Sequence, residues 1–410
     1  MSFIADFHIH SRYSRATSND MDISSLTKWA AAKGIAMLGT GDFTHPSWFA
    51  ELKSSLEGPE RGVYRRDGIY FVLTAEVSNI YFKAGRTRKV HNIIFAPDLN
   101  TAAEINSLLS EYGDLSSDGR PVLNLECDRM VKLLSAIDEN ILCVPSHAWT
   151  PHFSIFGSRS GFDSAEECFE DQTPKILSIE TGLSSDPEMN WRWSSLDRFT
   201  LMSNSDAHSP SKIGREANVF KEKIDYPALC EILRRKNDER FLYTIEFFPE
   251  EGKYHWDGHR LCGVALSPAE SSRNNNMCPV CGKKVTIGVM HRVEELADRK
   301  AGFVPKARPS FRKVVPLAEI VANALGRSAD SLAVQKEYMR IIKNLKNEMN
   351  ALLYASEDDL YHNCPTRVAE GIMNVRNGNV KIEPGYDGKY GKVKVLCAFD
   401  LSFEKQENLL

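Results

Sequence analysis

Short apolar runs alternate with helical patterns along roughly the first 245 residues of the chain. The runs lie at residues 3–5, 71–73, 142–144 and 201–202. Runs of this length are typical of strands that are buried on both faces of a parallel sheet. Strands that alternate with helices predict an α/β fold with a parallel sheet or barrel.

The helical pattern is clearest at residues 22–33. Ile23 and Leu26 begin an apolar face at helical spacing. Asp22 can cap the start of this helix, and Gly34 can end it in the left-handed conformation. Further helices are predicted at residues 131–137, 187–196 and 226–235.

Seven histidines and carboxylates lie in the apolar runs or follow them. They are His8, His10, Glu76, His91, His147, Asp206 and His208. Such groups collect at the carboxyl ends of barrel strands in enzymes, and imidazoles together with carboxylates suit zinc or manganese. One His-x-His pair would be weak evidence, because a histidine on a strand is more often a hydrogen-bonded polar residue than a ligand. A second pair and three further residues make coincidence a poor explanation.

The spacing of these residues predicts two ions. His8 and His10 are two residues apart, so they face the same side of a strand and can hold one ion together. Asp206 and His208 repeat this spacing. Glu76 can bridge two ions about 3.5–4 Å apart, the separation at which enzymes hydrolyse phosphate esters. We therefore assign the catalytic role to His8, His10, Glu76, Asp206 and His208.

Composition excludes several classes of protein. The chain has 410 residues, 42% of them hydrophobic, which is enough for two or three domains. The net charge of −4 gives no overall basic excess, so any nucleic-acid binding must use local patches. No apolar stretch approaches the roughly 20 residues of a membrane span, and we identify no signal peptide. Nine cysteines with one Cys-x-x-Cys indicate a reducing cytoplasm.

A second metal site, of different chemistry, is predicted between residues 246 and 300. Its four ligands are His259, Cys262, Cys278 and Cys281. They form two knuckle-like pairs at zinc-ribbon spacing, and four ligands would saturate a tetrahedral structural zinc. His255 and His291 are the alternatives to the histidine of this set. Buried free thiols are the competing explanation, which the Cys-Pro-Val-Cys-Gly sequence disfavours.

Beyond residue 300 the sequence predicts an extended basic linker followed by helices. Residues 301–315 hold four cationic side chains, Lys306, Arg308, Arg312 and Lys313. Residues 316–325 and 329–347 have helical periodicity, and Gly326 can end the first of these helices. Turn signals at residues 381–394 predict a hairpin or loop packed on the helices.

The first ligand set resembles that of the polymerase and histidinol phosphatase (PHP) superfamily. The matching positions are His8, His10, Glu76, His91, His147, Asp206 and His208. The resemblance implies a distorted (β/α)7 barrel over residues 1–245, with two or three active-site ions of zinc, manganese or magnesium. Two histidines of the family are replaced here, one by Ala16 and one by Asp42. Asp42 is therefore the expected ligand at the third and least regular metal site.

Four longer segments resemble the endonuclease Q family of DNA repair nucleases. They lie at residues 7–17, 41–46, 154–163 and 288–297. With a zinc ribbon at 246–300 and a basic linker and mostly helical region at 301–410, the resemblance covers nearly the whole chain. It implies hydrolysis of the DNA phosphodiester 5′ to a deaminated base (uracil, hypoxanthine or xanthine) or an abasic site, with flipping of the base. The sequence leaves open a sliding clamp or a helicase as protein partner.

Base recognition is expected in the loop after His147. The residues that can stack on a flipped base or read its edge are His152, Phe153, Phe156, Ser158 and Arg159. A loop that caps the barrel with buried aromatics is an equally good interpretation. Contacts to the DNA backbone are expected from Arg86, Arg88, Lys306, Arg308, Arg312 and Lys313. Solvated surface charge is the alternative for these six.

Two functions of different classes fit these features. One is the lesion-specific endonuclease. The other is a PHP-type small-molecule phosphoesterase in which the zinc ribbon serves assembly. The ribbon and the basic linker favour the first function, because a small substrate needs neither.

Overall fold

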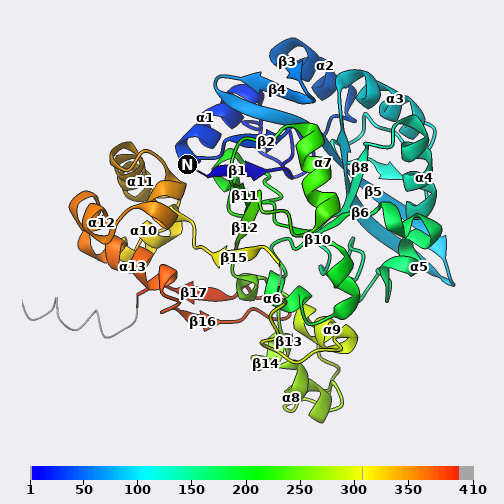
Figure 1. Cartoon of the computed structure of the whole chain (residues 1–410). Coiled ribbons are helices and arrows are strands. Elements are labelled where there is room, and N and C mark those ends of the chain that lie inside the picture. The colour runs from blue at the N-terminus through cyan, green and yellow to red at the C-terminus, as the bar shows by residue number, and fades with distance from the viewer. Residues whose placement is uncertain (1, 307, 397–410) are drawn as a thin grey trace, which may run out of the picture.

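A mixed sheet of eleven strands, with helices packed around it, is the largest element of the computed structural model (Figure 1), which describes residues 2–306 and 308–396. The fold is therefore α/β, as the sequence predicts. The strands of this sheet are β1 (Phe3–Asp6), β2 (Met37–Gly39), β3 (Glu57–Glu60), β4 (Val63–Arg66), β5 (Ile69–Lys83), β6 (Arg86–Ala96), β7 (Val122–Leu123), β8 (Leu142–Pro145), β11 (Ala217–Phe220), β12 (Phe241–Glu246) and β15 (Ser310–Lys313).

The strands of this sheet are not all parallel. β1, β2 and β5 pair in parallel, but β6 pairs antiparallel with both β5 and β8. β5 and β6 form one long hairpin, whose turn holds Ala84 and Gly85 at positive φ. The all-parallel sheet expected from the apolar runs is therefore wrong for β6 and β8, because a tight hairpin joins only antiparallel strands.

A separate parallel pair, β9 (Ser178–Glu180) and β10 (Thr200–Met202), connects β8 with β1. The amide of Ala148, just after β8, donates to the carbonyl of Glu180 at 2.9 Å. Ile9, just after β1, forms a parallel bridge with Ala207. The carboxyl ends of β1, β8, β9 and β10 therefore lie together.

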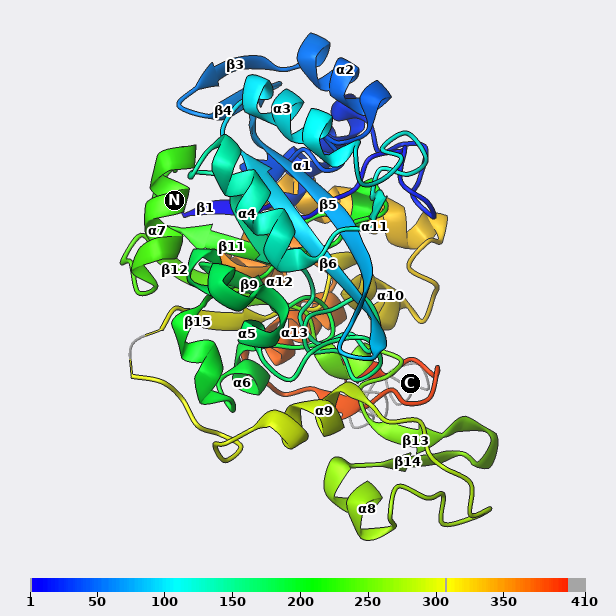
Figure 2. The same ribbon diagram turned by 90° about the vertical axis from the view of Figure 1, so that its right-hand side faces the viewer.

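Helices cover the outside of these strands. They are α1 (Ile23–Lys33), α2 (Pro46–Ser55), α3 (Leu99–Leu109), α4 (Cys127–Ile137), α5 (Ala165–Phe169), α6 (Pro187–Asn190) and α7 (Tyr226–Arg235). α3 and α4 lie against β5 and β6 (Figure 2). Short 3-10 helices are η1 (Glu170–Lys175), η2 (Ser194–Arg198), η3 (Pro210–Lys212), η4 (Pro249–Glu251) and η5 (Arg260–Cys262).

The predicted ends of α1 are confirmed. The Asp22 carboxylate accepts a hydrogen bond from the amide of Ser25, and Gly34 closes the helix at a φ of 84°. The helix expected at residues 187–196 is shorter than predicted, because α6 ends at Asn190 and η2 follows it as a separate 3-10 turn.

Part of the expected linker is a strand. β15 pairs in parallel with β12, so residues 310–313 extend the large sheet instead of crossing solvent. The Arg312 guanidinium lies 4.4 Å above the ring of Tyr243, and Lys313 Nζ lies 2.8 Å from the Asp186 carboxylate. Pairing of the backbone, which the prolines and charges do not reveal, decides the structure of this segment.

Two smaller parts complete the fold. The segment with the cysteines contains β13 (Asp257–His259), β14 (Val264–Leu266), α8 (Pro268–Arg273) and α9 (Val289–Leu296), with a small core around Leu266 and Val285. β13, β14 and α8 project from the body of the molecule (Figure 2). The C-terminal part contains α10 (Leu317–Leu325), α11 (Leu332–Asn344), the π-helix η6 (Asn350–Tyr354), α12 (Glu357–Asn363), α13 (Thr366–Arg376), β16 (Lys381–Glu383) and β17 (Lys392–Lys394).

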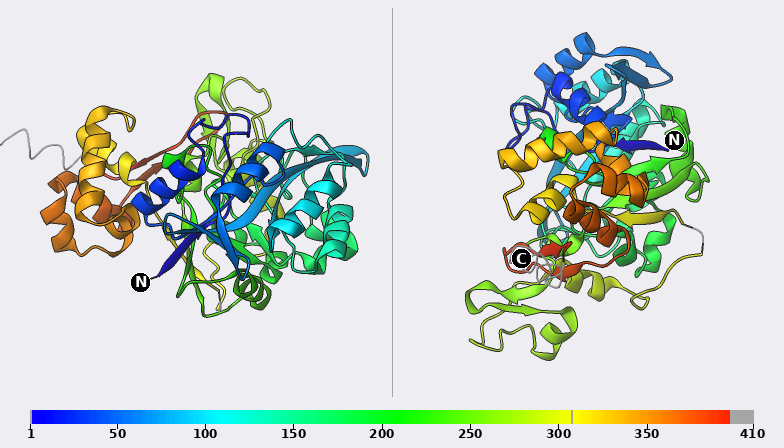
Figure 3. Two further views of the ribbon diagram at one scale, coloured as in Figure 1. Left: turned by 90° about the horizontal axis from the view of Figure 1, so that it is seen from above. Right: turned by 90° about the vertical axis from the view of Figure 1, so that its left-hand side faces the viewer.

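The last two strands form the predicted hairpin. α10 stops at Gly326, whose φ of 60° is the expected helix end. β16 and β17 extend from the C-terminal helices toward the cysteine-containing part (Figure 3). The amides of Gly385 and Gly391 in their turn donate to the carbonyls of Glu250 and Glu251 at 2.8 and 3.0 Å. The hairpin therefore joins the C-terminal helices to the segment that leads into β13.

A buried ion pair joins the C-terminal helices to α1, one of the helices that cover the large sheet. Lys33 on α1 donates to Glu348 at 2.7 Å, and both side chains are at most 4% exposed. Tyr338 Oη and the amide of Leu317 also donate to this carboxylate, at 2.7 and 3.0 Å. One hydrophobic cluster continues from α1 into α10 and α11 around the pair. Within the described residues, every helix is too short or too polar to span a membrane.

We expect Lys33→Met to lower the free energy of unfolding by about 3–5 kcal/mol, because it leaves a buried carboxylate without its cation. Urea unfolding of the variant measures this loss. The control is Lys28→Met on the exposed face of α1, expected to change stability by about 0.5 kcal/mol or less. Lys33→Met/Glu348→Leu should recover most of the loss. A double variant as unstable as the single one would contradict the assignment of the loss to the unpaired charge.

Candidate metal centre

Two groups of ligand atoms converge where the strand ends meet. His8, His10, Glu76 and Asp206 form one group, with one ligand atom from each within 4.8 Å of the others. The second group combines Glu76 with two further histidines, His91 and His147, whose ligand atoms also lie within 4.8 Å of one another. Glu76 belongs to both groups, so the structure brings together the bridging arrangement that the sequence predicts.

The backbone explains why these side chains face one another. The bridge between Ile9 and Ala207 sets the segment after β1 against the segment after β10, so that His8 and His10 lie beside Asp206. The sequence predicts Glu76 and His91 at the ends of strands. The structure places them inside β5 and β6 instead. They share a face because Ser78, two residues from Glu76, pairs directly with His91.

Two buried carboxylates orient the first histidine pair. Glu180 lies 3.0 Å from Nδ1 of His8 and also accepts the amide of His147 at 2.8 Å. Asp42 lies 3.0 Å from Nδ1 of His10. Both contacts turn the Nε2 atoms into the centre, and the buried Nε2 of His8 has no hydrogen-bond partner. An unpartnered, buried imidazole nitrogen that faces carboxylates fits a metal ion.

Glu180 was missed by the sequence argument. Its signal was available, because it directly follows the apolar pattern of residues 176–179, as the other acids follow their runs. Nothing in the pattern separated a carboxylate that orients ligands from one that binds the ion.

Neighbouring charges set the protonation of the centre. Burial disfavours a charge on His8, yet the carboxylates of Glu180 and Glu76 raise its pKa well above its usual value. Burial acts against the Glu76 anion, but the charge of His8 and hydrogen bonds from His10 and His147 hold the pKa of Glu76 well below its usual value. Burial lowers the pKa of His91 to about 4, so this imidazole is neutral at neutral pH. An anionic bridge and a neutral imidazole are the forms that bind metals.

Two predicted ligands lie outside both groups. The Asp42 carboxylate accepts hydrogen bonds from Ser11 and Ser14 as well as His10, so in this structure it orients His10, and its predicted role as a third-metal ligand stays a prediction. His208 packs its ring 4.5 Å from that of His10, and its Nδ1 contacts the carbonyl of Asp206. Within residues 2–306 and 308–396, the active-site region brings together ligand groups for two ions.

The second predicted site also converges. His259, Cys262, Cys278 and Cys281 place one ligand atom each within 4.8 Å of the others. Of the alternative histidines, His291 donates to Asp257 at 2.6 Å, and His255 lies outside the group. Burial raises the pKa of the Cys278 thiol, but the backbone amides of Cys281 and Val280 lower it to about 7. Amides aimed at sulfur favour the thiolate that zinc requires.

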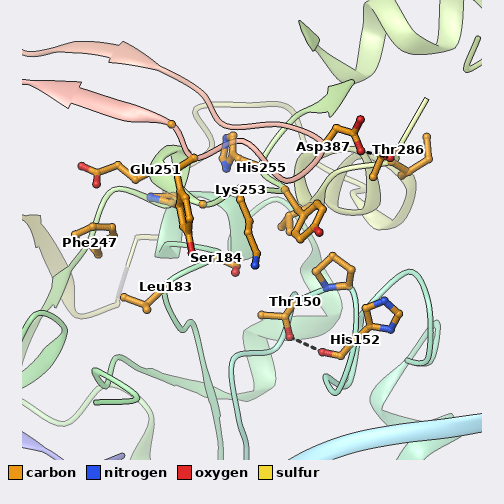
Figure 4. A pocket seen from close by; sticks show the side chains of 18 of the residues that line it. Thr150, His152, Leu183, Ser184, Phe247, Glu251, Lys253, His255, Thr286 and Asp387 are labelled. Atoms are coloured by element: carbon orange, nitrogen blue, oxygen red, sulfur yellow. Dashed lines mark hydrogen bonds between the residues drawn. The ribbon is translucent and has the colours of Figure 1, made fainter. Parts of the chain in front are cut away.

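A cavity of about 1080 Å³ adjoins the centre (Figure 4). Thr150 in its wall contacts Nδ1 of His147 at 3.2 Å, and Arg215 donates to the carbonyl of Ser205 at 2.9 Å, beside Asp206. Its other walls come from residues 247–255, 286–289 and 387–391. The cavity thus lies where three parts of the chain meet.

The expected base-recognition residues divide between cavity and core. His152 and Arg159 line the cavity, whereas Phe153 packs its ring 4.8 Å from that of His91. Phe156 is fully buried between Trp149 and Trp193, with ring centroids 5.2 and 5.0 Å away. Base stacking by Phe156 is therefore wrong, since that ring already fills the core. Ser158 is half-buried and lies outside the cavity lining.

The expected backbone contacts divide in a similar way. The side chains of Arg86, Lys306 and Arg312 are exposed. Arg88 is buried and donates to the carbonyl of Gly161, and Arg308 donates to the carbonyls of Phe199 and Asp197. Lys313 pairs with Asp186. For Arg88, Arg308 and Lys313 the prediction is corrected, because contacts within the protein already engage these side chains: Arg88 a carbonyl, and Arg308 and Lys313 the carboxylates of Asp197 and Asp186.

Arg120 is a further residue that the sequence argument missed. It lies on the loop between α3 and β7, and its Nη1 donates to Oε2 of Glu76 at 3.2 Å. A lone arginine in a polar loop carries no pattern that marks it as part of a site.

One family model and two curated relatives match parts of the chain. Residues 316–379 match the family of the MJ0043 C-terminal domain. The uncharacterized protein YqxK of Bacillus subtilis is 30% identical over 90% of this chain and 91% of its own length. The uncharacterized protein MJ0043 of Methanocaldococcus jannaschii is 34% identical over 60% of this chain, but the match spans only 31% of that protein.

Two solved structures resemble the chain along almost its full length. One is the lesion-specific endonuclease PfuEndoQ from Pyrococcus furiosus, with 30% identity, a TM-score of 0.86 and coverage of 98% of this chain and 99% of that one. The other is endonuclease Q in complex with a 27-mer duplex that carries an abasic lesion at the active site, with 30% identity, a TM-score of 0.85 and coverage of 97% of both chains. The chain therefore belongs to the endonuclease Q family.

Proposed function

We propose that the protein is a metal-dependent endonuclease that hydrolyses the DNA phosphodiester 5′ to a deaminated base (uracil, hypoxanthine or xanthine) or an abasic site. The observation that carries the proposal is the sharing of Glu76 by two groups of ligand atoms in a chain of the endonuclease Q family. Two divalent ions of zinc, manganese or magnesium held there would supply the Lewis-acid chemistry of phosphodiester cleavage. The free thiols of the described cysteines agree with a cytoplasmic protein.

The roles of the protein groups follow from their positions. His8, His10 and Asp206 would hold one ion, His91 and His147 the other, and Glu76 both. We propose that the large sheet without β15, together with the β9–β10 pair, forms the distorted PHP barrel over residues 1–245, followed by the zinc ribbon at 246–300, and that β15 adds a strand to this sheet from the region beyond the ribbon. The region at 301–410 would close the far wall of the cavity through its hairpin turn, whose amides are bonded to Glu250 and Glu251.

The cavity is the proposed site for the extruded nucleotide. It adjoins His147, and it combines aromatic rings at Tyr254 and Tyr390 with polar side chains at His152 and Arg159. Stacking and edge hydrogen bonds of this kind read a flipped base. The exposed charges of Arg86, Lys306 and Arg312 are the proposed contacts to the DNA backbone.

Cleavage of labelled duplexes that contain uracil, hypoxanthine or an abasic site tests the proposal directly. The wild type should cut 5′ to each lesion and leave undamaged duplex intact. Asp206→Asn should abolish cleavage while leaving DNA binding measurable by fluorescence anisotropy, because it removes a ligand charge and almost no volume. Equal cleavage of damaged and undamaged duplex, or a preference for small phosphomonoesters, would favour the small-molecule phosphoesterase instead.

Lesion selectivity should depend on the cavity wall. Tyr390→Ala removes a ring that is 68% exposed at the cavity, and should slow cleavage at uracil or hypoxanthine by roughly tenfold or more, in line with about 1–3 kcal/mol per stacked base. Cleavage at an abasic site, which offers no ring, should change little. The matched control is Phe82→Ala, which removes an equally exposed ring at the tip of the β5–β6 hairpin. Equal losses on all lesions would argue for a structural role of Tyr390.

The zinc ribbon should be a folding element. Cys278→Ser should reduce bound zinc by one equivalent, measured by elemental analysis, and expose the ribbon to limited proteolysis, because zinc binding there is folding energy. Cys364→Ser, at a buried cysteine outside all three ligand groups, is the control. Retention of the full zinc content by Cys278→Ser would refute the ligand assignment.

A further inference from the structure

We propose that Arg120 is a catalytic residue that binds a non-bridging oxygen of the scissile phosphate and stabilises the charge that develops there. The inference rests on the proposed function, because it assumes a phosphodiester substrate at the Glu76 centre. It adds a protein cation to a site whose sequence pattern contains only metal ligands.

The position of the guanidinium is the first argument. Its Nη1 donates to Oε2 of Glu76 at 3.2 Å, and the side chain is 24% exposed, so it reaches the centre while keeping an open side. Among the described residues this is the one hydrogen bond that the side chain makes. Four of the five N–H donors of an arginine therefore remain free for another acceptor.

The loop that carries Arg120 is held firmly over the centre. The amide of Gly119 donates to the carbonyl of Tyr13 at 3.0 Å, and the carbonyl of Pro121 accepts the amide of Ser78 at 2.9 Å. A Cβ atom at Gly119 would clash with the side chains of Asp42 and Ser14, so glycine lets the loop approach them without displacing them. The loop is thus locked both to the segment after β1 and to β5, and Arg120 is pre-positioned between these anchors.

The charges around Arg120 favour an anion as the ligand of its guanidinium. Oε1 of Glu76 contacts His91 and His147, and Oε2 contacts His10 and Arg120. When both oxygens of Glu76 are ligands to ions, the guanidinium becomes a cation beside other cations. An anion between them offsets this repulsion, and the planar fork of arginine matches the oxygens of phosphate.

A purely positioning role for Arg120, in which it only holds Glu76, predicts a different pattern of effects. Loss of a positioning contact would loosen Glu76 and reduce metal binding. Loss of a substrate contact would leave the metals in place and slow the chemical step.

The test compares Arg120→Ala and Arg120→Lys with Arg12→Ala. Arg12 is an arginine of a neighbouring loop whose guanidinium donates to Glu51 at 2.7 Å instead of to the centre. The single-turnover rate at an abasic duplex should fall about 10²–10³-fold in Arg120→Ala, the usual cost of removing one donor to a developing charge. Arg120→Lys should retain part of the rate, and Arg12→Ala should stay within about threefold of wild type.

Two further measurements separate the interpretations. Metal content by elemental analysis should equal that of wild type in Arg120→Ala, and abasic-duplex binding in EDTA should weaken in Arg120→Ala but not in Arg12→Ala. Phosphorothioate at one non-bridging position should slow wild type more than Arg120→Ala, because only wild type has the contact to lose. A rate within threefold of wild type, or a rate loss matched by metal loss, would overturn the inference.

Failure of the proposed function is distinguishable from failure of this inference. If wild type cleaves none of the lesion duplexes, the proposed function falls. The inference is then decided on bis(p-nitrophenyl) phosphate, on which Arg120→Ala must be slower than Arg12→Ala at equal metal content. Equal rates of the two variants on this diester would overturn it.

Discussion

The shared carboxylate of Glu76 is the constraint on which the rest of the site depends. Glu76 lies inside β5, so the face of β5 that carries this residue must point into the centre. The partner strand β6 must bring His91 to the same face. A one-residue slip between these strands would turn one of the two side chains away. The long hairpin, with its eleven paired positions, makes such a slip costly because every buried side chain would change face at once.

Burial alone does not decide the charge of the acids around this centre. Glu76 stays anionic because histidines surround it. For Glu216, burial and the neighbouring carboxylate of Glu246 hold the pKa well above its usual value. Glu246 behaves like Glu216, since burial again raises its pKa and its contacts are to neutral hydroxyls such as that of Thr181. Carboxylates of equal burial thus have a lowered pKa at the centre and a raised pKa behind it. Positive charge, from imidazole or from a bound ion, is what separates the two cases.

The sequence was sufficient where the determinants are local. The caps of α1 at Asp22 and Gly34 are set by backbone geometry within one turn, and the histidine-cysteine spacing places its four ligands through two short knuckles. The convergence of His8 and His10 could also be predicted, because alternation along a strand fixes which residues share a face. The same rule applied to Asp206 and His208 holds only for Asp206, since His208 lies outside the ligand groups.

The remaining features depend on contacts between distant segments. Asp42 matched a ligand position in the sequence. In the fold, the amide and hydroxyl of Ser11 and the hydroxyl of Ser14 donate hydrogen bonds to its carboxylate. Phe156 looked available because nothing local showed that Trp149 and Trp193 enclose it. Residues 310–313 looked like a linker because the free edge of β12 that they pair with is far away in sequence. Glu180 follows an apolar run just as the ligands do, and Arg120 carries no pattern, so only the fold reveals what these two side chains face.

The hairpin turn that forms one wall of the cavity has a consequence for the order in which the protein matures. The ligands of the Glu76 centre all precede residue 209, whereas Gly385 and Gly391, which hold the wall against Glu250 and Glu251, are made almost two hundred residues later. On the ribosome, the candidate metal ligands emerge long before the cavity can close. A nascent chain, or one clipped ahead of β16, would carry these side chains without the wall that encloses the cavity beside them.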